Sequence, residues 1–212
     1  MFSVIFDMDG TPLDTQRICI PAWDYAGKLQ GFEGVGESVT KVCGMNEAGW
    51  TRYLEEHFSG IDTNFFKREM RDYIIRNGVV KFKDGAEELL KFLKEKGIKI
   101  AIASGSSRES INHHLKAVSA EGYFDAIVGG RDIENGKPAP DIFLKAAELL
   151  GAKPQNCFVF EDSANGIRAG YAAGMKCIGV PDIAPFSEET KKLMFAELKT
   201  LSEAIDIFKG YI

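Results

Sequence analysis

Short apolar runs, separated in the second half of the chain by stretches with helical periodicity, are the feature that most restricts the fold of this sequence. The strand-like runs are residues 2–6, 98–103, 126–128, 157–160 and 177–180. Between them, apolar residues such as Leu89, Leu90 and Leu93 return on one side of a helix, as expected for helices with one buried face. This alternation predicts right-handed β-α-β units. We therefore expect an α/β fold whose parallel sheet is covered by helices on both faces.

Residues 15–80 interrupt this alternation. They contain no strand-like run, and their Gly-rich or polar turns separate stretches of helical periodicity. The helices expected here cover residues 17–29, 46–58 and 64–76.

The interruption divides the chain into two expected domains. Residues 1–14 and 81–212 would form the α/β core domain, and residues 15–80 a small helical cap domain. Where the core resumes, Asp84 is expected to cap the next helix, with Glu87 three residues later completing a capping box.

The composition of the 212 residues is that of an ordinary globular protein, with 45% hydrophobic and 27% charged residues. Its apolar runs are far shorter than the roughly 20 residues of a transmembrane helix, and the first residues form a strand-like run rather than a signal peptide. We expect a cytoplasmic protein without a membrane partner.

The net charge of −5 disfavours nucleic-acid binding. The four scattered cysteines predict reduced thiols rather than disulfides or a zinc site.

Two aspartates directly follow the first strand-like run. Asp7 and Asp9 lie in the stretch DMDGT at residues 7–11, at the carboxyl end of a strand, where open α/β sheets bind ligands. Residues two apart on an extended chain point to the same side, and Gly10 permits a sharp turn. Both acids can therefore face one ligand, although this pattern alone also occurs in turns and calcium-binding loops.

Polar residues also follow later strands or loops. They are Ser104-Gly105-Ser106, Gly136-Lys137-Pro138 and Glu161-Asp162. Each group has an ordinary explanation by itself: a loop, a solvated turn lysine, and a helix start capped by Asp162. Their coincidence at successive ends favours one shared site.

Taken in this order, the motifs resemble those of the haloacid dehalogenase (HAD) superfamily. That superfamily shares DxDGT, then Ser or Thr, then Lys, then paired acids. The stretches at 7–11, 137–141 and 160–167 are similar to the phosphoglycolate phosphatase and β-phosphoglucomutase branch. This resemblance implies a Rossmann-like parallel-sheet core, the HAD fold, with a helical cap inserted after the first strand.

The resemblance also implies a reaction: Mg²⁺-dependent phosphoryl transfer through an aspartyl phosphate. Asp7 would be the nucleophile and Asp9 the general acid and base, assisted by Lys137 and Ser104. The phosphate-binding groups implied are Ser104, Gly105, Lys137 and the backbone around Met8 and Asp9. The Mg²⁺ ligands implied are Asp7, the backbone carbonyl of Asp9, Asp162, and Glu161 acting through water.

The main interpretation is a phosphatase, monomeric or weakly homo-oligomeric, that acts on a small phosphorylated metabolite such as a sugar or polyol phosphate. A β-phosphoglucomutase-like mutase is the alternative. It would hold a second phosphate on the cap with an arginine after a glycine equivalent to Gly44, where this sequence reads Met45-Asn46-Glu47. Lys41, Arg17 or Arg52 could take the place of that arginine. A phosphonoacetaldehyde hydrolase-like enzyme, with Lys28 or Lys41 forming a Schiff base, ranks third. A non-catalytic phosphate-binding module ranks last, because it would not need the nucleophile and the metal acids.

Two positions depart from the family pattern. Pro12 stands where an aliphatic residue is usual, and its fixed φ and missing N–H are expected to alter the hairpin between core and cap. Gln16 stands where a glutamate is frequent, so a polar contact to the leaving group is expected to differ.

Overall fold

A parallel β-sheet forms the centre of the protein. The computed structural model describes residues 2–42 and 45–212. In this part of the chain, six parallel strands are arranged in the order β3-β2-β1-β4-β5-β6. Their bounds are β1 (Ser3–Phe6), β2 (Lys99–Ala103), β3 (Ala126–Val128), β4 (Cys157–Glu161), β5 (Lys176–Gly179) and β6 (Ala196–Glu197). The predicted α/β fold with a parallel sheet is confirmed, and β6 is an additional short strand at one edge.

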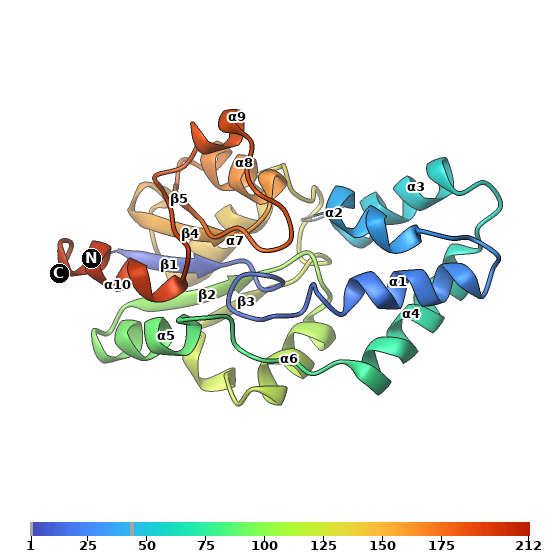
Figure 1. Ribbon diagram of the computed structural model, residues 1–212. Helices are drawn as coiled ribbons and strands as arrows, with labels where there is room; N and C mark the ends of the chain where they lie inside the picture. The colour runs from blue at the N-terminus through green and yellow to red at the C-terminus, as the bar shows by residue number, and fades with distance from the viewer. Residues whose placement is uncertain (1, 43–44) are drawn as a thin grey trace.

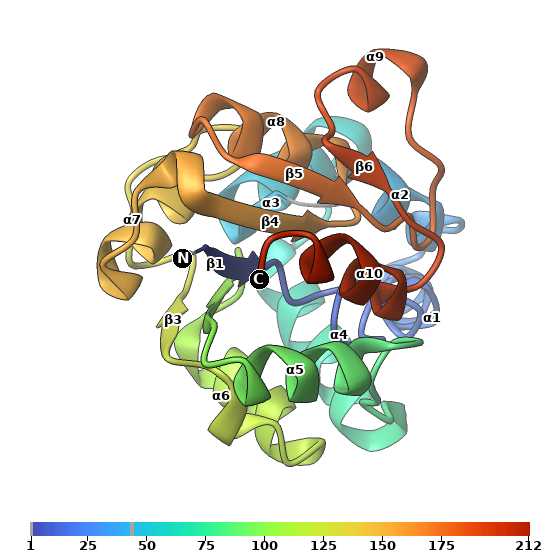
Figure 2. The same ribbon diagram turned by 90° about the vertical axis from the view of Figure 1, so that its left-hand side faces the viewer.

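Helices cover both faces of the sheet (Figure 2). Side chains of β1 alternate between the faces, as the two-residue period of a strand requires: Val4 and Phe6 pack on one side and Ile5 on the other. The first face is covered by α5 (Ala86–Glu95), α6 (Arg108–Ala117) and α10 (Ala204–Lys209). The second face is covered by α7 (Asp141–Leu150) and α8 (Ala164–Ala172). Short helical segments are η2 (Glu121–Tyr123), η3 (Pro154–Asn156), α9 (Glu188–Lys191) and η4 (Leu201–Glu203).

A second group of helices lies at the end of the molecule away from the two termini (Figure 1). It comprises α1 (Cys19–Lys28), η1 (Val35–Ser38), α2 (Val39–Val42), α3 (Glu47–His57) and α4 (Thr63–Asn77). These helices enclose an apolar cluster of their own, in which Trp23 packs edge-on against Phe66 and beside Trp50. Because this cluster is distinct from those of the sheet, we propose that residues 15–80 form a cap domain.

The two connections between the sheet and these helices run side by side. The Asp14 N–H donates to the Lys81 carbonyl at 2.9 Å, and the Lys83 N–H donates to the Pro12 carbonyl at 3.0 Å. Leu13 and Phe82 form the antiparallel bridge between them. Pro12 takes part in this pairing through its carbonyl group, so its missing N–H does not prevent the hairpin from forming.

The predicted cap of the helix after the second connection is wrong. α5 begins after Gly85, which has a left-handed conformation (φ 76°), and no side chain caps its N-terminus. The Asp84 carbonyl instead accepts a hydrogen bond from the Leu201 N–H at 3.1 Å. A Cβ atom at Gly85 would lie 2.4 Å from the Ser202 nitrogen. Tight packing against residues 201–202 therefore sets this turn, and it requires glycine.

The described cysteines, Cys19, Cys157 and Cys177, are free thiols. Burial raises the pKa of Cys19 and of Cys177 to about 12 and that of Cys157 to about 11, which makes them weak nucleophiles. Cys43 lies outside the described residues. Within those residues, every helix is too short or too polar to cross a lipid bilayer.

A buried carboxylate ties both connections to the core. The side chain of Asp182 is fully buried. Its carboxylate lies 2.5 Å from the Lys83 ammonium group and 3.6 Å from the Arg17 guanidinium group.

We expect Asp182→Ala to lower the free energy of unfolding by about 3 kcal/mol, because it leaves the Lys83 charge largely buried without its partner. Arg17 is 67% exposed, so Arg17→Ala should cost less than about 1 kcal/mol. Urea denaturation measures both values, and equal losses would contradict this assignment.

Candidate active site

The polar residues predicted to share a site meet at the carboxyl edge of the sheet. Asp7 follows β1 directly, Ser104 follows β2, and Glu161 ends β4. Since β2 and β4 are the two neighbours of β1, their carboxyl ends bring these side chains together. Lys137 reaches the same place from the loop before α7, and Asp162 from the turn before α8.

Lys137 forms the centre of a buried ionic cluster. Its ammonium group donates to Asp7 Oδ1, to Glu161 Oε1 at 2.5 Å and to the Ala103 carbonyl at 3.3 Å. The Lys137 side chain is only 2% exposed, although most lysines are solvated. The ordinary explanation of a solvated turn lysine is therefore wrong for this residue.

Acidic groups outnumber the one ammonium group in this cluster. Burial raises the pKa of Asp7 to about 8, and the Lys137 ammonium only partly opposes this effect. Burial, together with Glu161 and Asp7, also raises the pKa of Asp162 well above its usual value. Burial alone would lower the pKa of Lys137, but the nearby Asp7 and Glu161 carboxylates raise it. Lys137 therefore stays charged, and the carboxylates favour the binding of a further positive charge.

Hydroxyl groups hold the side chain of Asp9. The Thr15 hydroxyl donates to Asp9 Oδ1 at 2.6 Å, while Ser104 and Ser106 donate to Oδ2 at 3.2 and 3.0 Å. The Ser104 hydroxyl also accepts the Ser106 N–H at 3.1 Å. Sequence reasoning singled out Ser104 but missed the hydroxyls of Thr15 and Ser106. In the sequence, only the positions of Thr15 and Ser106 close to predicted site residues could have indicated that their hydroxyls contact Asp9.

Glu161 lies behind Lys137 and links it to α8. Its Oε2 accepts hydrogen bonds from the Ser163 N–H at 3.0 Å and from the Ser163 hydroxyl at 2.8 Å. Ser163 in turn caps α8 by accepting the Gly166 N–H at 3.0 Å. The helix cap is therefore Ser163 and not Asp162. Both Glu161 oxygens have protein partners, so its role toward a metal through water stays a prediction.

Gly166 is required by the burial of Glu161. A Cβ atom at Gly166 would lie 1.7 Å from Glu161 Oε1, far inside the contact distance of any real pair of atoms. Glycine at this position lets the first turn of α8 cover the carboxylate closely, and so keeps Glu161 out of water.

The oxygen atoms of Asp9 and Asp162 suit a hard divalent cation. Gln16 Nε2 donates to the Asp9 carbonyl and to Asp162 Oδ2, both at 2.7 Å, so the positive end of a dipole already lies between these oxygens. No group of three or more His, Cys, Asp or Glu side chains within residues 2–42 and 45–212 is arranged as a metal cage. Mg²⁺ does not need one, because it binds one or two carboxylates and keeps several waters. Asp7, Asp162 and the Asp9 carbonyl therefore fit such an ion.

The cap helix α3 begins directly over the core loops. Asn46 caps α3 by accepting the Gly49 N–H at 2.9 Å. A Cβ atom at Gly136 would lie 2.6 Å from Asn46 Nδ2, and one at Gly105 would lie 3.4 Å from the Met45 carbonyl. Glycine at position 136, beside Lys137, thus lets Asn46 approach closely, whereas a Cβ atom at Gly105 would make only an ordinary contact. Met8, by contrast, has its side chain in the core, and the phosphate-binding role of its backbone amide stays a prediction.

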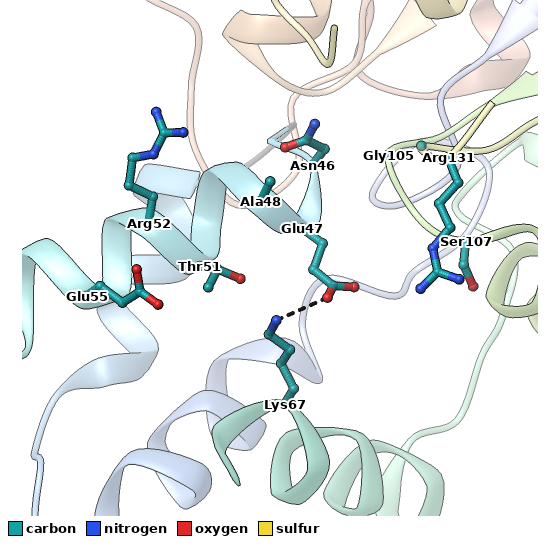
Figure 3. A pocket seen from close by; sticks show the side chains of 11 residues that line it. Asn46, Glu47, Ala48, Thr51, Arg52, Glu55, Lys67, Gly105, Ser107 and Arg131 are labelled. Carbon is teal, nitrogen blue, oxygen red and sulfur yellow. Dashed lines mark hydrogen bonds and ion pairs between the residues drawn. The ribbon is translucent and has the colours of Figure 1, made fainter. Parts of the chain in front are cut away.

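A pocket of about 580 Å³ opens between α3, α4 and the core loops. Its lining is mostly polar or charged: Asn46, Glu47, Ala48, Thr51, Arg52, Glu55, Lys67, Gly105, Ser107, Gly130 and Arg131. Figure 3 shows Glu47 and Lys67 on the cap side, joined by an ion pair of 3.1 Å, and Ser107 and Arg131 on the core side. Gly105 and Ser107 in this lining flank Ser106, whose hydroxyl contacts Asp9, whereas Asp7, Asp9, Lys137 and Asp162 are not among the lining residues. The pocket can accommodate a small polar molecule.

Comparisons with known proteins agree with this architecture. A phosphorylated carbohydrates phosphatase of Thermotoga maritima is 33% identical over 84% of this chain and 84% of its own length. A probable pseudouridine-5'-phosphatase of Drosophila melanogaster is 32% identical over 88% of this chain and 84% of its own. The crystal structure of a putative β-phosphoglucomutase from Thermotoga maritima superposes with a TM-score of 0.78 at 28% identity, covering all of both chains.

The family model for haloacid dehalogenase-like hydrolase matches residues 3–174. This range spans β1, the cap helices and the Lys137 loop, and it includes Glu161 and Asp162. The chain therefore belongs to the haloacid dehalogenase-like hydrolases.

Proposed function

We propose that this hydrolase is a Mg²⁺-dependent phosphatase of a small phosphorylated metabolite, such as a sugar or polyol phosphate, and that Asp7 is its nucleophile. The observation that carries the proposal is the contact between the buried Asp7 carboxylate and Lys137, with Asp9 held two residues away. Relatives named as phosphatases support it. The substrate class rests on the polar pocket between cap and core.

The first half-reaction transfers the phosphoryl group to the protein. An Asp7 carboxylate oxygen forms a bond to phosphorus while the bond from phosphorus to the leaving oxygen breaks. Asp9 gives its proton to that oxygen and releases an alcohol. Lys137 stabilises the phosphoryl oxygens by its charge, and the hydroxyl of Ser104 and the backbone amides of the loops can add neutral hydrogen bonds.

The second half-reaction restores the enzyme. A water molecule attacks the phosphorus of the aspartyl phosphate and gives its proton to Asp9, while the bond between phosphorus and Asp7 breaks. The products are inorganic phosphate and the original Asp7 carboxylate. A hydroxyl can accept as well as donate a hydrogen bond, so Thr15, Ser104 and Ser106 can hold Asp9 in both of its protonation states.

A divalent cation would be held by Asp7, Asp162 and the Asp9 carbonyl. When bound, it supplies positive charge that offsets the repulsion between the Asp7 carboxylate and an anionic substrate. Glu161 fixes the position of Lys137 by accepting a hydrogen bond from its ammonium group.

Removal of divalent metal ions should abolish phosphate release. Excess EDTA is expected to bring the rate to the background of the buffer, because the buried carboxylates would repel the substrate. Addition of Mg²⁺ should restore the rate and also raise the melting temperature of the protein, by mass action. Phosphate release and thermal melting measure the two effects, and full activity in excess EDTA would contradict the proposed cofactor.

A mutase is the second candidate, favoured by the similarity to the putative β-phosphoglucomutase. The cap of such an enzyme must bind a second phosphate. The helices α3 and α4 bring Glu47, Arg52, Glu55 and Lys67 to the lining of the pocket, and Lys67 is paired with Glu47. The two carboxylates disfavour a second phosphate, whereas Arg52 supplies a positive charge that favours one. Gly44, the glycine that the mutase arginine would follow, lies outside the described residues.

The phosphonoacetaldehyde hydrolase alternative needs a desolvated lysine in the cap. Lys28 is 59% exposed, and Lys41 is also exposed. Neither has the buried surroundings that this chemistry requires.

Phosphate release from a panel of sugar, polyol and short-acid phosphates with Mg²⁺ tests the proposed function. Release by the wild type, but not by Asp7→Asn, is the expected result and identifies the substrate class. Conversion of glucose 1-phosphate to glucose 6-phosphate without phosphate release would instead establish the mutase.

A further inference from the structure

Gln16 contacts two of the oxygen atoms that fit the divalent cation. Its Nε2 lies 2.7 Å from the Asp9 carbonyl and 2.7 Å from Asp162 Oδ2. Gln16 and Asp162 are each only 7% exposed. The amide is thus a buried hydrogen-bond donor that bridges a backbone oxygen and a carboxylate oxygen, as a cation between them would.

The space around these atoms is tightly filled. A Cβ atom at Gly10 would lie 2.6 Å from both Gln16 Nε2 and Asp162 Oδ2, and Gly10 has a φ of +84°. A Mg²⁺ ion bonds to oxygen at about 2.0–2.1 Å and requires near-octahedral geometry. An ion bound to the Asp9 carbonyl and Asp162 Oδ2 on the side where the Gln16 amide lies would overlap it, so the two cannot occupy that position together.

We propose that the Gln16 amide is an internal competitor of the divalent cation, which must displace it from Asp9 and Asp162 in order to bind. This inference rests on the cation site of the proposed function. The competition lowers the apparent affinity for the ion, because only the fraction of molecules with the amide moved away can bind. The amide also satisfies the buried oxygens while it is in place.

The position of Gln16 connects this exchange to the cap. Gln16 lies in the first connection, and its carbonyl accepts the N–H of Cys19, the first residue of α1, at 2.9 Å. The preceding residue, Thr15, contacts Asp9 Oδ1. Displacement of the amide therefore takes place at the junction between the cation site and the first turn of the cap.

Gln16→Ala removes the competitor and leaves the Asp9 and Asp162 oxygens accessible. We expect the dissociation constant for Mn²⁺ to fall by about five- to tenfold, the size expected when hydrogen bonds of ordinary net strength no longer have to be broken. Gln16→Met keeps the volume of the side chain without its N–H group and should shift the constant in the same direction. Gln155→Ala, at an exposed glutamine far along the chain, should leave it unchanged.

Titration of the 212-residue protein with Mn²⁺ alone, following the electron paramagnetic resonance signal of the free ion, measures these constants without any substrate. Circular dichroism checks that each variant is folded. Tighter binding by Gln16→Ala or Gln16→Met than by the wild type and Gln155→Ala is the expected result. Unchanged or weaker binding by both Gln16 variants would overturn the competition while leaving the cation site intact. A wild type that binds no Mn²⁺ would overturn the cation site as well.

Discussion

Asp7→Asn should lower the rate of phosphate release by about 10⁴-fold or more, as expected for the loss of a covalent nucleophile. An amide is a poor nucleophile, and it cannot form the acyl phosphate on which the second half-reaction depends. The substitution hardly changes the volume of the side chain. It also relieves the cost of burying a carboxylate whose pKa burial raises to about 8.

The folded state should therefore survive this substitution, and its thermal stability at neutral pH should not fall. Asp206→Asn is the matched control, because Asp206 is 83% exposed on α10 and forms an ion pair with Lys209. It should retain full activity. Phosphate release by Asp7→Asn within tenfold of the wild type would show that another group attacks the phosphorus.

Lys137→Met should abolish phosphate release and lower the free energy of unfolding by about 3–5 kcal/mol. The substitution removes the ammonium group that contacts both Asp7 and Glu161 and leaves two buried carboxylates without it. Urea denaturation measures the stability, and the phosphate assay measures the activity. Lys145→Met is the control, because Lys145 is 41% exposed and forms an ion pair with Glu148 on the surface of α7.

A second substitution separates the stability effect from the catalytic effect. Glu161→Gln in the Lys137→Met background removes one of the unpaired charges, so it should recover at least about 1 kcal/mol of the lost stability. It should recover no activity, because the phosphoryl oxygens would still lack the Lys137 charge. If the double variant is less stable than Lys137→Met, the buried carboxylates do not repel one another as the structure indicates.

Much of the fold follows from the sequence pattern. Buried parallel strands have continuous apolar sequences, so residues 98–103 and 157–160 could be recognised as strands by composition alone. β6 could not, because two residues are too few to show a period. The same limit applies to η1 and α2, which have four residues each.

Predictions from local sequence patterns were wrong where contacts with distant segments determine the structure. Asp84 and Glu87 fit the pattern of a capping box, but α5 instead starts from a left-handed Gly85 that packs against Ser202. Those residues are more than a hundred positions apart in sequence. No local pattern around Asp84 contains this contact.

The candidate site likewise combines residues that the sequence predicts with contacts that it does not predict. Asp7, Lys137, Glu161 and Asp162 could be named from the motifs, and the structure brings all of them to one edge of the sheet. Their partners could not be named in this way. The contact of Gln16 with Asp162 spans 146 positions, and Ser106 contacts Asp9 across 97 positions. Such contacts depend on how the cap connection and the loops fold over the sheet.

Direct detection of the covalent intermediate tests the central claim, that Asp7 attacks phosphorus. The wild type would be mixed with its best substrate, quenched in acid within the first turnover, digested and analysed by mass spectrometry. The account predicts that the peptide with Asp7 gains the mass of one phosphoryl group, and that hydroxylamine removes it. Phosphate release with no such peptide, or a phosphoryl group on another residue, would contradict the account.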